Sequence, residues 1–319
     1  MERMLFALFA PVLFAAYVPS CRTPVVHQST PAAWDSRMPE LWERPANIAD
    51  RDLRWGSWGE GRAPDPNAVY RFVEPKLTGS NPGMTVRDPQ GRKWSVKQAN
   101  PELGAEGPVE VTLARVLEAA GYHQPPVYYL PSFTLAGDGP TRVVPGGRFR
   151  LSVPELSARG EWSWQENPFV GSKPYQGLLV ILLLFNSSDL KNSNNTLYTY
   201  RPSPGRTQTW YVVRDIGTAL GKTGRIGPHR GDVAGFERTR FIIGMDDGYV
   251  RFDYHGFHQE LVEGRITPDD VRWACELVGG LTDRQWHDAF DAGGFNRTVA
   301  DRFIRRLQQR IREGEELGR

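Results

Sequence analysis

A short run in the second half of the chain holds the residues best suited to chemistry. Asp189, Lys191 and Asn194 follow one another with the spacing Asp-x-Lys-x-x-Asn, directly after an apolar run and before a strand-like stretch. A carboxylate can orient or deprotonate a hydroxyl, an ammonium can neutralise phosphate charge, and oxygen atoms can bind Mg²⁺. This loop therefore carries the side chains that phosphoryl transfer needs, with Asp189 and Lys191 as catalytic residues.

A second acidic position follows the next predicted strand. Trp210 to Val213 has the pattern of a buried strand, and Arg214-Asp215-Ile216-Gly217 comes directly after it. This run places a carboxylate that can bind a metal before an apolar plug and a glycine. We expect Asn194 and Asp215 to be the metal ligands.

These two segments together resemble the catalytic loop and the metal-binding Asp-Phe-Gly segment of the protein-kinase-like superfamily, with Ile216 in place of Phe. The form Asn-x-x-Asp-x-Lys-x-x-Asn is similar to the atypical branches, namely HipA-type bacterial kinases, phosphoinositide kinases and secretory-pathway kinases. Ser187 and Ser188 depart from the His-Arg of ordinary protein kinases, and no Ala-Pro-Glu follows Asp215. The resemblance implies a two-lobed fold that uses ATP and Mg²⁺ as cofactors.

The resemblance also implies nucleotide-binding residues in the first half of the chain. Lys97 ends the strand-like run Trp94 to Lys97, and Glu110 opens an amphipathic helix that is expected to run to Ala120. An ion pair between them would direct the Lys97 ammonium at the phosphates. Gly79 and Gly83 belong to a loop that would cover the phosphates.

The predicted elements fit that fold. Turn and strand signals predict strands at 69–73, 84–87, 93–98, 127–130 and 148–153, with one helix among them. An apolar run from Gly177 to Phe185 predicts a buried helix, and Thr267 and Thr282 are expected to cap later helices. We therefore predict an α+β protein with an antiparallel-sheet N-lobe that contains one helix (68–155) and a mainly helical C-lobe (156–319).

The first 67 residues differ in composition from the rest. An apolar stretch follows Arg3 and ends before Cys21, as in an export signal over residues 1–20. The expected location is therefore outside the cytoplasm, periplasmic or extracellular. Cys21 lies in a run similar to a bacterial lipobox, and a membrane tether through a lipidated Cys21 stays open. Residues 21–67 lack a regular period and are expected to form a tether that wraps or precedes the domain.

The charge balance does not indicate a nucleic-acid partner. The chain has 39 Lys and Arg residues against 37 Asp and Glu residues, and the last predicted helix contains the densest group of arginines. We expect those arginines to form a solvated face, with a membrane or partner patch as the alternative, and the group is Arg305, Arg306, Arg310 and Arg312.

Each site residue has a structural alternative. Asp189 and Asn194 could cap turns, and Asp215 could pair with Arg214 or Lys222. Lys97 could be an exposed strand lysine, and Glu110 could serve only as a favourable first-turn charge. Asn195 competes with Asn194 for the metal role.

The sequence therefore predicts an ATP- and Mg²⁺-dependent phosphotransferase of the atypical kinase-like type, acting on an acceptor that the sequence does not identify. Two alternatives keep the same fold. One is an exported pseudokinase-like binding or scaffold module, and the other is an enzyme that transfers AMP instead of phosphate.

Overall fold

The computed structural model describes residues 36–77, 81–100, 102, 104–137, 139–224 and 230–318. The predicted export signal, Cys21 and Gly79 lie outside the described residues.

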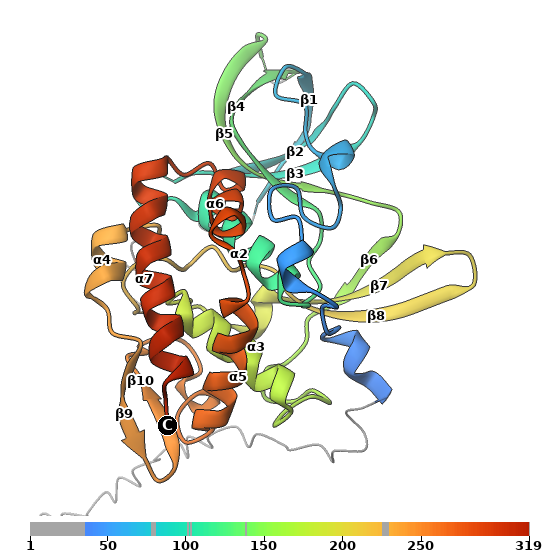
Figure 1. Ribbon diagram of the computed structural model, residues 1–319. Coiled ribbons are helices and arrows are strands. Elements are labelled where there is room, and N and C mark those ends of the chain that lie inside the picture. Colours follow the sequence, from blue (N-terminus) through green and yellow to red (C-terminus); the bar gives the residue numbers. More distant parts are fainter. Residues whose placement is uncertain are drawn as a thin grey trace, which may run out of the picture.

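Five strands form a closed barrel, drawn at the top of Figure 1. They are β1 (Val69–Pro75), β2 (Gly83–Arg87), β3 (Lys93–Gln98), β4 (Val127–Ala136) and β5 (Arg142–Leu151), and their order in the barrel is β1-β2-β3-β5-β4. Alternate residues point to the two sides of a strand, so each strand can bury one row of apolar side chains. Trp94, Val96 and Phe149 form part of this buried row.

The predicted antiparallel sheet is wrong in one respect, because β1 pairs with β4 in parallel. Four pairings around the barrel are antiparallel. When neighbouring strands alternate in direction, the first and the fifth strand run the same way. A barrel of five strands can therefore close only through a parallel pair, and the β4 and β5 strands are also longer than predicted.

Helix α2 (Glu106–Ala119) lies between the barrel and the helices below it (Figure 1). It begins one turn earlier than predicted, at Glu106 instead of Glu110. Pro108 lies within this first turn, where proline is tolerated because the backbone amides have no partner inside the helix. Glu110 thus lies in the second turn and is not a first-turn residue.

The second half is rich in helices, as predicted. Helix α3 (Lys173–Leu184) is buried along nearly its whole length and is capped by Ser172. Helices α5 (Pro268–Gly279) and α7 (Arg297–Glu315) pack against it, α6 (Asp283–Ala292) packs against α2 and α7, and the short α4 (Val233–Arg238) contacts α7. The predicted caps at Thr267 and Thr282 are both present as complete capping boxes. The α+β class is therefore confirmed, with a sheet-rich lobe and helices.

Two smaller sheets complete the described part of the chain. Strands β6 (Leu156–Gly160), β7 (Asn195–Ser203) and β8 (Arg206–Val213) form an antiparallel sheet, and η4 (Asn192–Asn194) is a 3-10 turn directly before β7. Strands β9 (Ile242–Asp246) and β10 (Tyr249–Phe252) form a hairpin, and η5 (Gln259–Leu261) follows it. The β7–β8 hairpin is long and projects from the body (Figure 1).

Arg310 does not lie on a solvated face, so the prediction is wrong for this residue. Its side chain is fully buried, and its guanidinium donates to the carbonyls of Leu184, Phe236 and Thr239 and to the side chain of Asn186. The sequence pattern concealed this role because Arg310 alternates with exposed residues of α7 such as Arg312. Arg310 therefore ties α7 to the end of α3 and to the loop after it.

Residues 36–67 contain three 3-10 turns, η1 (Met38–Glu40), η2 (Ile48–Asp50) and η3 (Glu60–Arg62). They pack against the body of the protein. Leu41 and Leu53 are buried in the same core as the helices, and Gln285 on α6 donates to the carbonyls of Ile48 and Arg51. Across the described ranges, no helix combines the length and apolarity that a membrane span requires.

Candidate functional site

The Lys97 ammonium is the centre of a buried charge cluster. Its Nζ lies 2.8 Å from Glu106 Oε1 and 3.0 Å from Glu110 Oε2, and it also contacts Asp215 Oδ1. The Lys97 side chain is 4% exposed and the Glu110 side chain 1% exposed. The expected ion pair between Lys97 and Glu110 is present, and Lys97 is not an exposed strand lysine.

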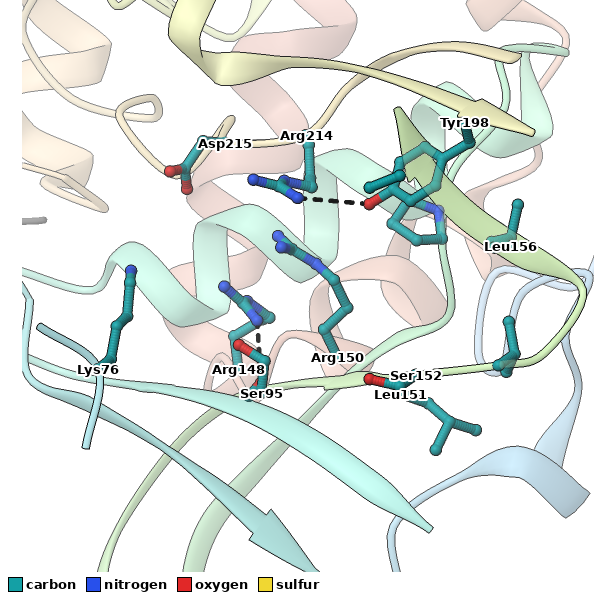
Figure 2. A pocket seen from close by; sticks show the side chains of 13 residues that line it. Lys76, Ser95, Arg148, Arg150, Leu151, Ser152, Leu156, Tyr198, Arg214 and Asp215 are labelled. Carbon is teal, nitrogen blue, oxygen red and sulfur yellow. Dashed lines mark hydrogen bonds between the residues drawn. The ribbon is translucent and has the colours of Figure 1, made fainter. Parts of the chain in front are cut away.

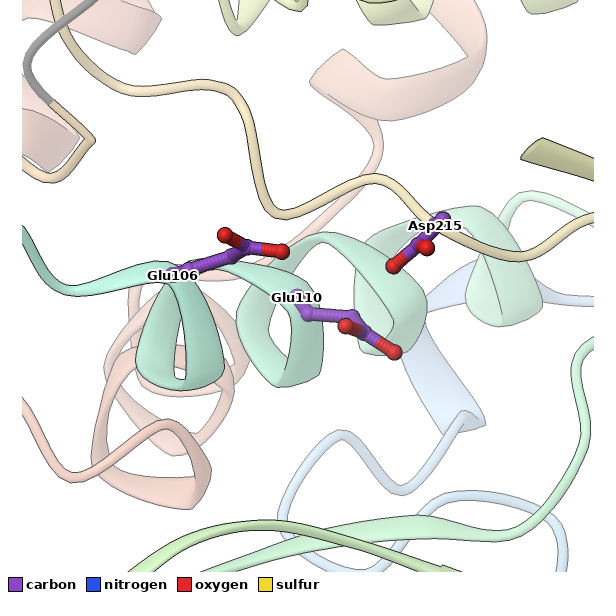
Figure 3. Close-up of side chains that lie close together, drawn as sticks. All are labelled: Glu106, Glu110 and Asp215. Carbon is purple, nitrogen blue, oxygen red and sulfur yellow. The ribbon is translucent and has the colours of Figure 1, made fainter. Parts of the chain in front are cut away.

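Secondary structure explains why these groups meet. Lys97 lies at the end of β3, while Glu106 and Glu110 are four residues apart on α2 and therefore share one face of the helix. Figure 3 shows Asp215 on a neighbouring segment, with its carboxylate directed toward that helix. One oxygen from each of the three acids lies within 4.8 Å of the others.

The charges in this cluster shift one another's protonation. Burial lowers the pKa of Lys97, but the carboxylates of Glu110, Asp215 and Glu106 outweigh burial and raise it overall. Burial raises the pKa of Glu110, but Arg148, Lys97 and Arg150 outweigh it, so that pKa is lowered. The pKa of Asp215 is likewise lowered, against the effect of burial, chiefly by Lys97. All three groups are therefore charged at neutral pH.

Asp215 and Asn194 are neighbours because β7 and β8 pair in register. Asn195 lies opposite Val213, so the residues just outside this pair are Asn194 and Arg214. The carbonyl of Asn194 accepts from the backbone amides of Arg214 at 2.9 Å and Asp215 at 3.3 Å. The partner of Asp215 is Lys97, not the Arg214 or Lys222 that the sequence left open.

Within the predicted catalytic loop, Lys191 Nζ lies 2.9 Å from Asp189 Oδ1. The side-chain amide of Asn194 donates to the Asp189 carbonyl at 2.6 Å, which leaves its oxygen as the atom that can reach a cation. Asn195 is fully buried and donates to the Trp162 carbonyl, so it is held in the core. The geometry therefore favours the half-buried Asn194 over the buried Asn195 as the candidate metal ligand.

The described part of the predicted phosphate loop reaches the same cluster. Gly83 lies directly opposite Lys97 in the β2–β3 ladder, and a Cβ at this position would lie 2.7 Å from the Val96 carbonyl. Asn81 Nδ2 donates to Glu106 Oε2 at 2.5 Å. The described residues Asn81 and Gly83 therefore lie next to the charge cluster.

Glu106 was not predicted, although it joins several parts of the site. It accepts from Lys97 and Asn81, and it also forms an ion pair with Arg230. A Cβ on Gly217 would lie 2.3 Å from its Cγ, so the glycine after Asp215 and Ile216 permits this approach. The signal that could have identified Glu106 is its spacing of four residues from Glu110.

A cavity of about 400 Å³ opens beside the cluster. Figure 2 shows Asp215 and Lys76 on one side of it and Leu156 on the other. Its apolar lining comes from the β5–β6 connection and neighbouring residues, which are Pro125, Leu151, Val153, Leu156 and Ala158. Ligand pockets commonly have this size and combine an apolar wall with a few charged groups.

Three arginines, none of them predicted as site residues, also line this cavity. Figure 2 shows the guanidinium groups of Arg148, Arg150 and Arg214 gathered at its centre. Arg148 Nε and Arg150 Nη2 lie 2.9 Å and 2.7 Å from the same oxygen of Glu110. Arg148 and Arg150 are two residues apart on β5, and this spacing places them on one face of a strand. That alternation was the available sequence signal.

Comparisons with known proteins find similarity among solved structures. No protein-family model matches the chain, and no curated protein matches it. Among solved structures, the proinflammatory kinase CtkA of Helicobacter pylori is similar at 11% identity and a TM-score of 0.47, over 78% of this chain and 98% of that chain. The Rio2 kinase–ADP/Mg²⁺–phosphoaspartate complex of Chaetomium thermophilum is similar at 14% identity and a TM-score of 0.29, over 77% of this chain and 72% of that chain. At these TM-scores neither structure carries an argument about this chain.

Proposed function

We propose that the protein is an ATP- and Mg²⁺-dependent phosphotransferase with a two-lobed, atypical kinase-like architecture. The observation that carries the proposal is the convergence of Lys97 from β3, Glu110 from α2 and Asp215 from the segment after β8 beside one cavity. Lys97 would hold the nucleotide phosphates, as the paired lysine does in phosphoryl-transfer sites.

The donor set fits Mg²⁺. Asp215 offers a carboxylate and Asn194 a side-chain oxygen, and hydrogen bonds hold their backbones together. Hard cations such as Mg²⁺ prefer oxygen ligands of these types. When bound, Mg²⁺ supplies positive charge that neutralises the phosphate oxygens.

The residues of the catalytic loop have complementary roles in this proposal. The Asp189 carboxylate orients the acceptor hydroxyl and takes its proton, as the acceptor oxygen forms a bond to the terminal phosphorus and the bond to the leaving oxygen of ADP breaks. Lys191, which lies beside Asp189 and packs 4.1 Å from the centre of the Phe257 ring, neutralises the transferred group. The acceptor can be a protein, a lipid or a small molecule.

The test compares nucleotide binding with transfer. ATP with Mg²⁺ is expected to raise the melting temperature of the purified protein, and Asp215→Asn is expected to remove the part of the shift that depends on Mg²⁺. Asp189→Asn is expected to keep that shift and to lose transfer of labelled γ-phosphate by a factor of about 100 or more. Asp246→Asn, an exposed acid on β9, is the matched control and should change neither reading.

The same assay separates the alternatives. Label transferred from the α-phosphate instead of the γ-phosphate would indicate AMP transfer. A nucleotide-dependent shift without transfer to protein, lipid, sugar or small-molecule acceptors would favour a scaffold. No shift with ATP and Mg²⁺ in the unmutated protein would contradict the proposal.

Export and lipidation at Cys21 are separate proposals. They rest on the apolar leader that precedes Cys21 in the sequence. Mass measurement of the mature amino terminus after expression in bacteria tests both, because cleavage and acylation change the mass of the first residue in different ways.

A further inference from the structure

The cavity beside Asp215 has an excess of positive charge. Its lining includes four cationic side chains, Lys76, Arg148, Arg150 and Arg214, and a single carboxylate, Asp215. The Glu110 carboxylate lies next to the arginines, but its two oxygens are shared among three cations. Its Oε2 is bound by Lys97, and its Oε1 is bound by both Arg148 and Arg150.

The neighbouring groups do not satisfy these arginines fully. The Nε of Arg150 is buried and has no hydrogen-bond partner within the described ranges. Arg214 donates to the hydroxyl of Tyr198 at a long 3.4 Å. Burial, together with the charges of Arg148 and Arg214, lowers the pKa of Arg150 to about 10.

Such an arrangement is costly unless an anion completes it. Buried like charges repel one another, and a buried charge needs a partner of opposite sign. Guanidinium groups bind phosphate oxygens through short, charge-assisted hydrogen bonds, often two at a time. Because the three guanidinium groups come from β5 and from the residue after β8, they can face one ligand from two directions (Figure 2).

We propose that Arg148, Arg150 and Arg214 form an anion site that binds a phosphate chain without a divalent metal. The site deepens the proposed function and rests on it in one respect, because the phosphate chain is taken to be that of a nucleotide. The arginines supply the charge neutralisation that Mg²⁺ would otherwise provide during binding. Asn194 and Asp215 then add the part of binding that depends on Mg²⁺ and serve the transfer step, whereas capture of the phosphate chain does not require them.

The experiment measures binding to the full chain by calorimetry in EDTA, with three probes. ATP, inorganic triphosphate and adenosine distinguish the phosphate chain from the base. ATP and triphosphate are expected to bind, and their affinity is expected to fall at least about tenfold when NaCl is raised from about 0.05 M to about 0.3 M, since salt screens partly exposed charges. Adenosine binding is expected to be weak and to depend little on salt.

Two variants locate the effect. Arg150→Gln and Arg214→Gln are each expected to weaken triphosphate binding about 10- to 100-fold, as expected for the loss of a charge-assisted hydrogen bond, and to leave adenosine binding within about twofold. Arg159→Gln is the control, because Arg159 is an exposed arginine on β6 outside the cavity. Arg214 is only half buried, so its variant tests the site even if Arg150→Gln does not fold.

Two outcomes would overturn the inference: triphosphate that binds no better than adenosine, or Arg150→Gln and Arg214→Gln variants that bind it as well as Arg159→Gln does. The proposed function is tested separately by Mg²⁺-dependent transfer of γ-phosphate. An active transferase that binds no triphosphate in EDTA would refute only the anion site. Metal-free triphosphate binding without any transfer would refute only the phosphotransferase.

Discussion

The charged region formed by the Lys97 cluster and the arginines of the neighbouring cavity has two ends, which differ in how their charges are balanced. At one end a single ammonium, on Lys97, is met by three carboxylates. At the other end the guanidinium groups of Arg148 and Arg150 share one oxygen of Glu110, and Arg214 stands beside them with a phenol as its hydrogen-bond partner. At the first end the protein's own carboxylates balance the positive charge, whereas at the second end positive charge is in excess.

This difference arises because two side chains of one helix meet cations from two strands. Glu106 and Glu110 on α2 contact Lys97 of β3, Glu110 also contacts the arginines of β5, and the two carboxylates do not balance every cation. Glu106 forms ion pairs with Lys97 and Arg230, and Glu110 forms ion pairs with Lys97 and the β5 arginines. The balanced end is therefore expected to contribute to stability in addition to the role proposed for Lys97 at the phosphates, and the cationic end is expected to contribute chiefly to ligand binding.

The largest effect is expected from Glu110→Gln. This change keeps the shape of the side chain but removes the carboxylate that balances Lys97, Arg148 and Arg150 in the interior. Breaking a buried ion pair from one side leaves uncompensated charge and typically costs about 3–5 kcal/mol. Urea denaturation of the variant and the unmutated protein measures the loss of unfolding free energy.

Glu60→Gln is the control for that measurement. Glu60 is exposed in the η3 turn, so its replacement is expected to change the unfolding free energy by no more than about 0.5 kcal/mol. A loss below about 1 kcal/mol in Glu110→Gln would contradict the expectation that the Glu110 carboxylate stabilises the buried cations of the folded protein.

A smaller loss is expected from Arg310→Gln. Arg310 is a buried arginine without a carboxylate partner, but unlike Arg150 it is met by four oxygen acceptors and by the ring of Phe236 at 4.1 Å. Removing the guanidinium leaves buried acceptors unmet, which is expected to cost about 3 kcal/mol in denaturant unfolding.

Arg312→Gln, an exposed position on the same helix, is the matched control for Arg310→Gln and should be nearly neutral. Equal stability of the two variants would mean that the buried hydrogen bonds of Arg310 do not contribute to the free energy of unfolding.

Much of the fold could be predicted from local sequence signals. The bounds of β3 were predicted to the residue, and the capping boxes at Thr267 and Thr282 followed from short-range spacing alone. Barrel closure, and with it the parallel β1–β4 pair, depends on contacts between distant segments. Hydrophobic periodicity does not determine such long-range pairing.

The site was predictable in the same uneven way. Lys97, Glu110 and Asp215 could be proposed to meet because the resemblance fixed their order along the chain, and the structure brings them together. The arginines on β5 could not be assigned to the cavity, since alternation on a strand shows which residues share a face but not what that face meets. Arg310 was misjudged for the same reason.

The pH dependence of the unfolding free energy in acid gives a further test of Glu110. Glu110 has a pKa below its ordinary 4.5 in the folded protein because Arg148, Lys97 and Arg150 outweigh the effect of burial. A lowered carboxyl pKa contributes stability that is fully present above the unfolded pKa and is lost as pH falls through the folded pKa. The stability gap between the unmutated protein and Glu110→Gln is therefore expected to shrink below about pH 4.5, by at most about 1.4 kcal/mol for each pH unit.

That dependence is read from denaturant midpoints of both proteins at a series of pH values. The charged groups that face Glu110 are Lys97 on β3, the two β5 arginines, and the carboxylates of Glu106 and Asp215. A gap that stays constant down to acid pH would contradict the expectation that the lowered pKa of Glu110 in the folded protein contributes to this gap.

The smallest change in stability is expected from Arg150→Met. This substitution fills similar space and removes one of three neighbouring positive charges, while Glu110 keeps Lys97 and Arg148 as partners. The unfolding free energy is expected to stay within about 1 kcal/mol of the unmutated value and to move toward greater stability, because burial already disfavours the charged form of Arg150.

Arg148→Met is the comparison. Arg148 also donates to the Ser95 carbonyl at 3.0 Å, so its replacement is expected to cost about 2 kcal/mol. A loss above about 2 kcal/mol in Arg150→Met would make that arginine part of the protein's own stability, and the cavity would then have no charge in reserve for a ligand.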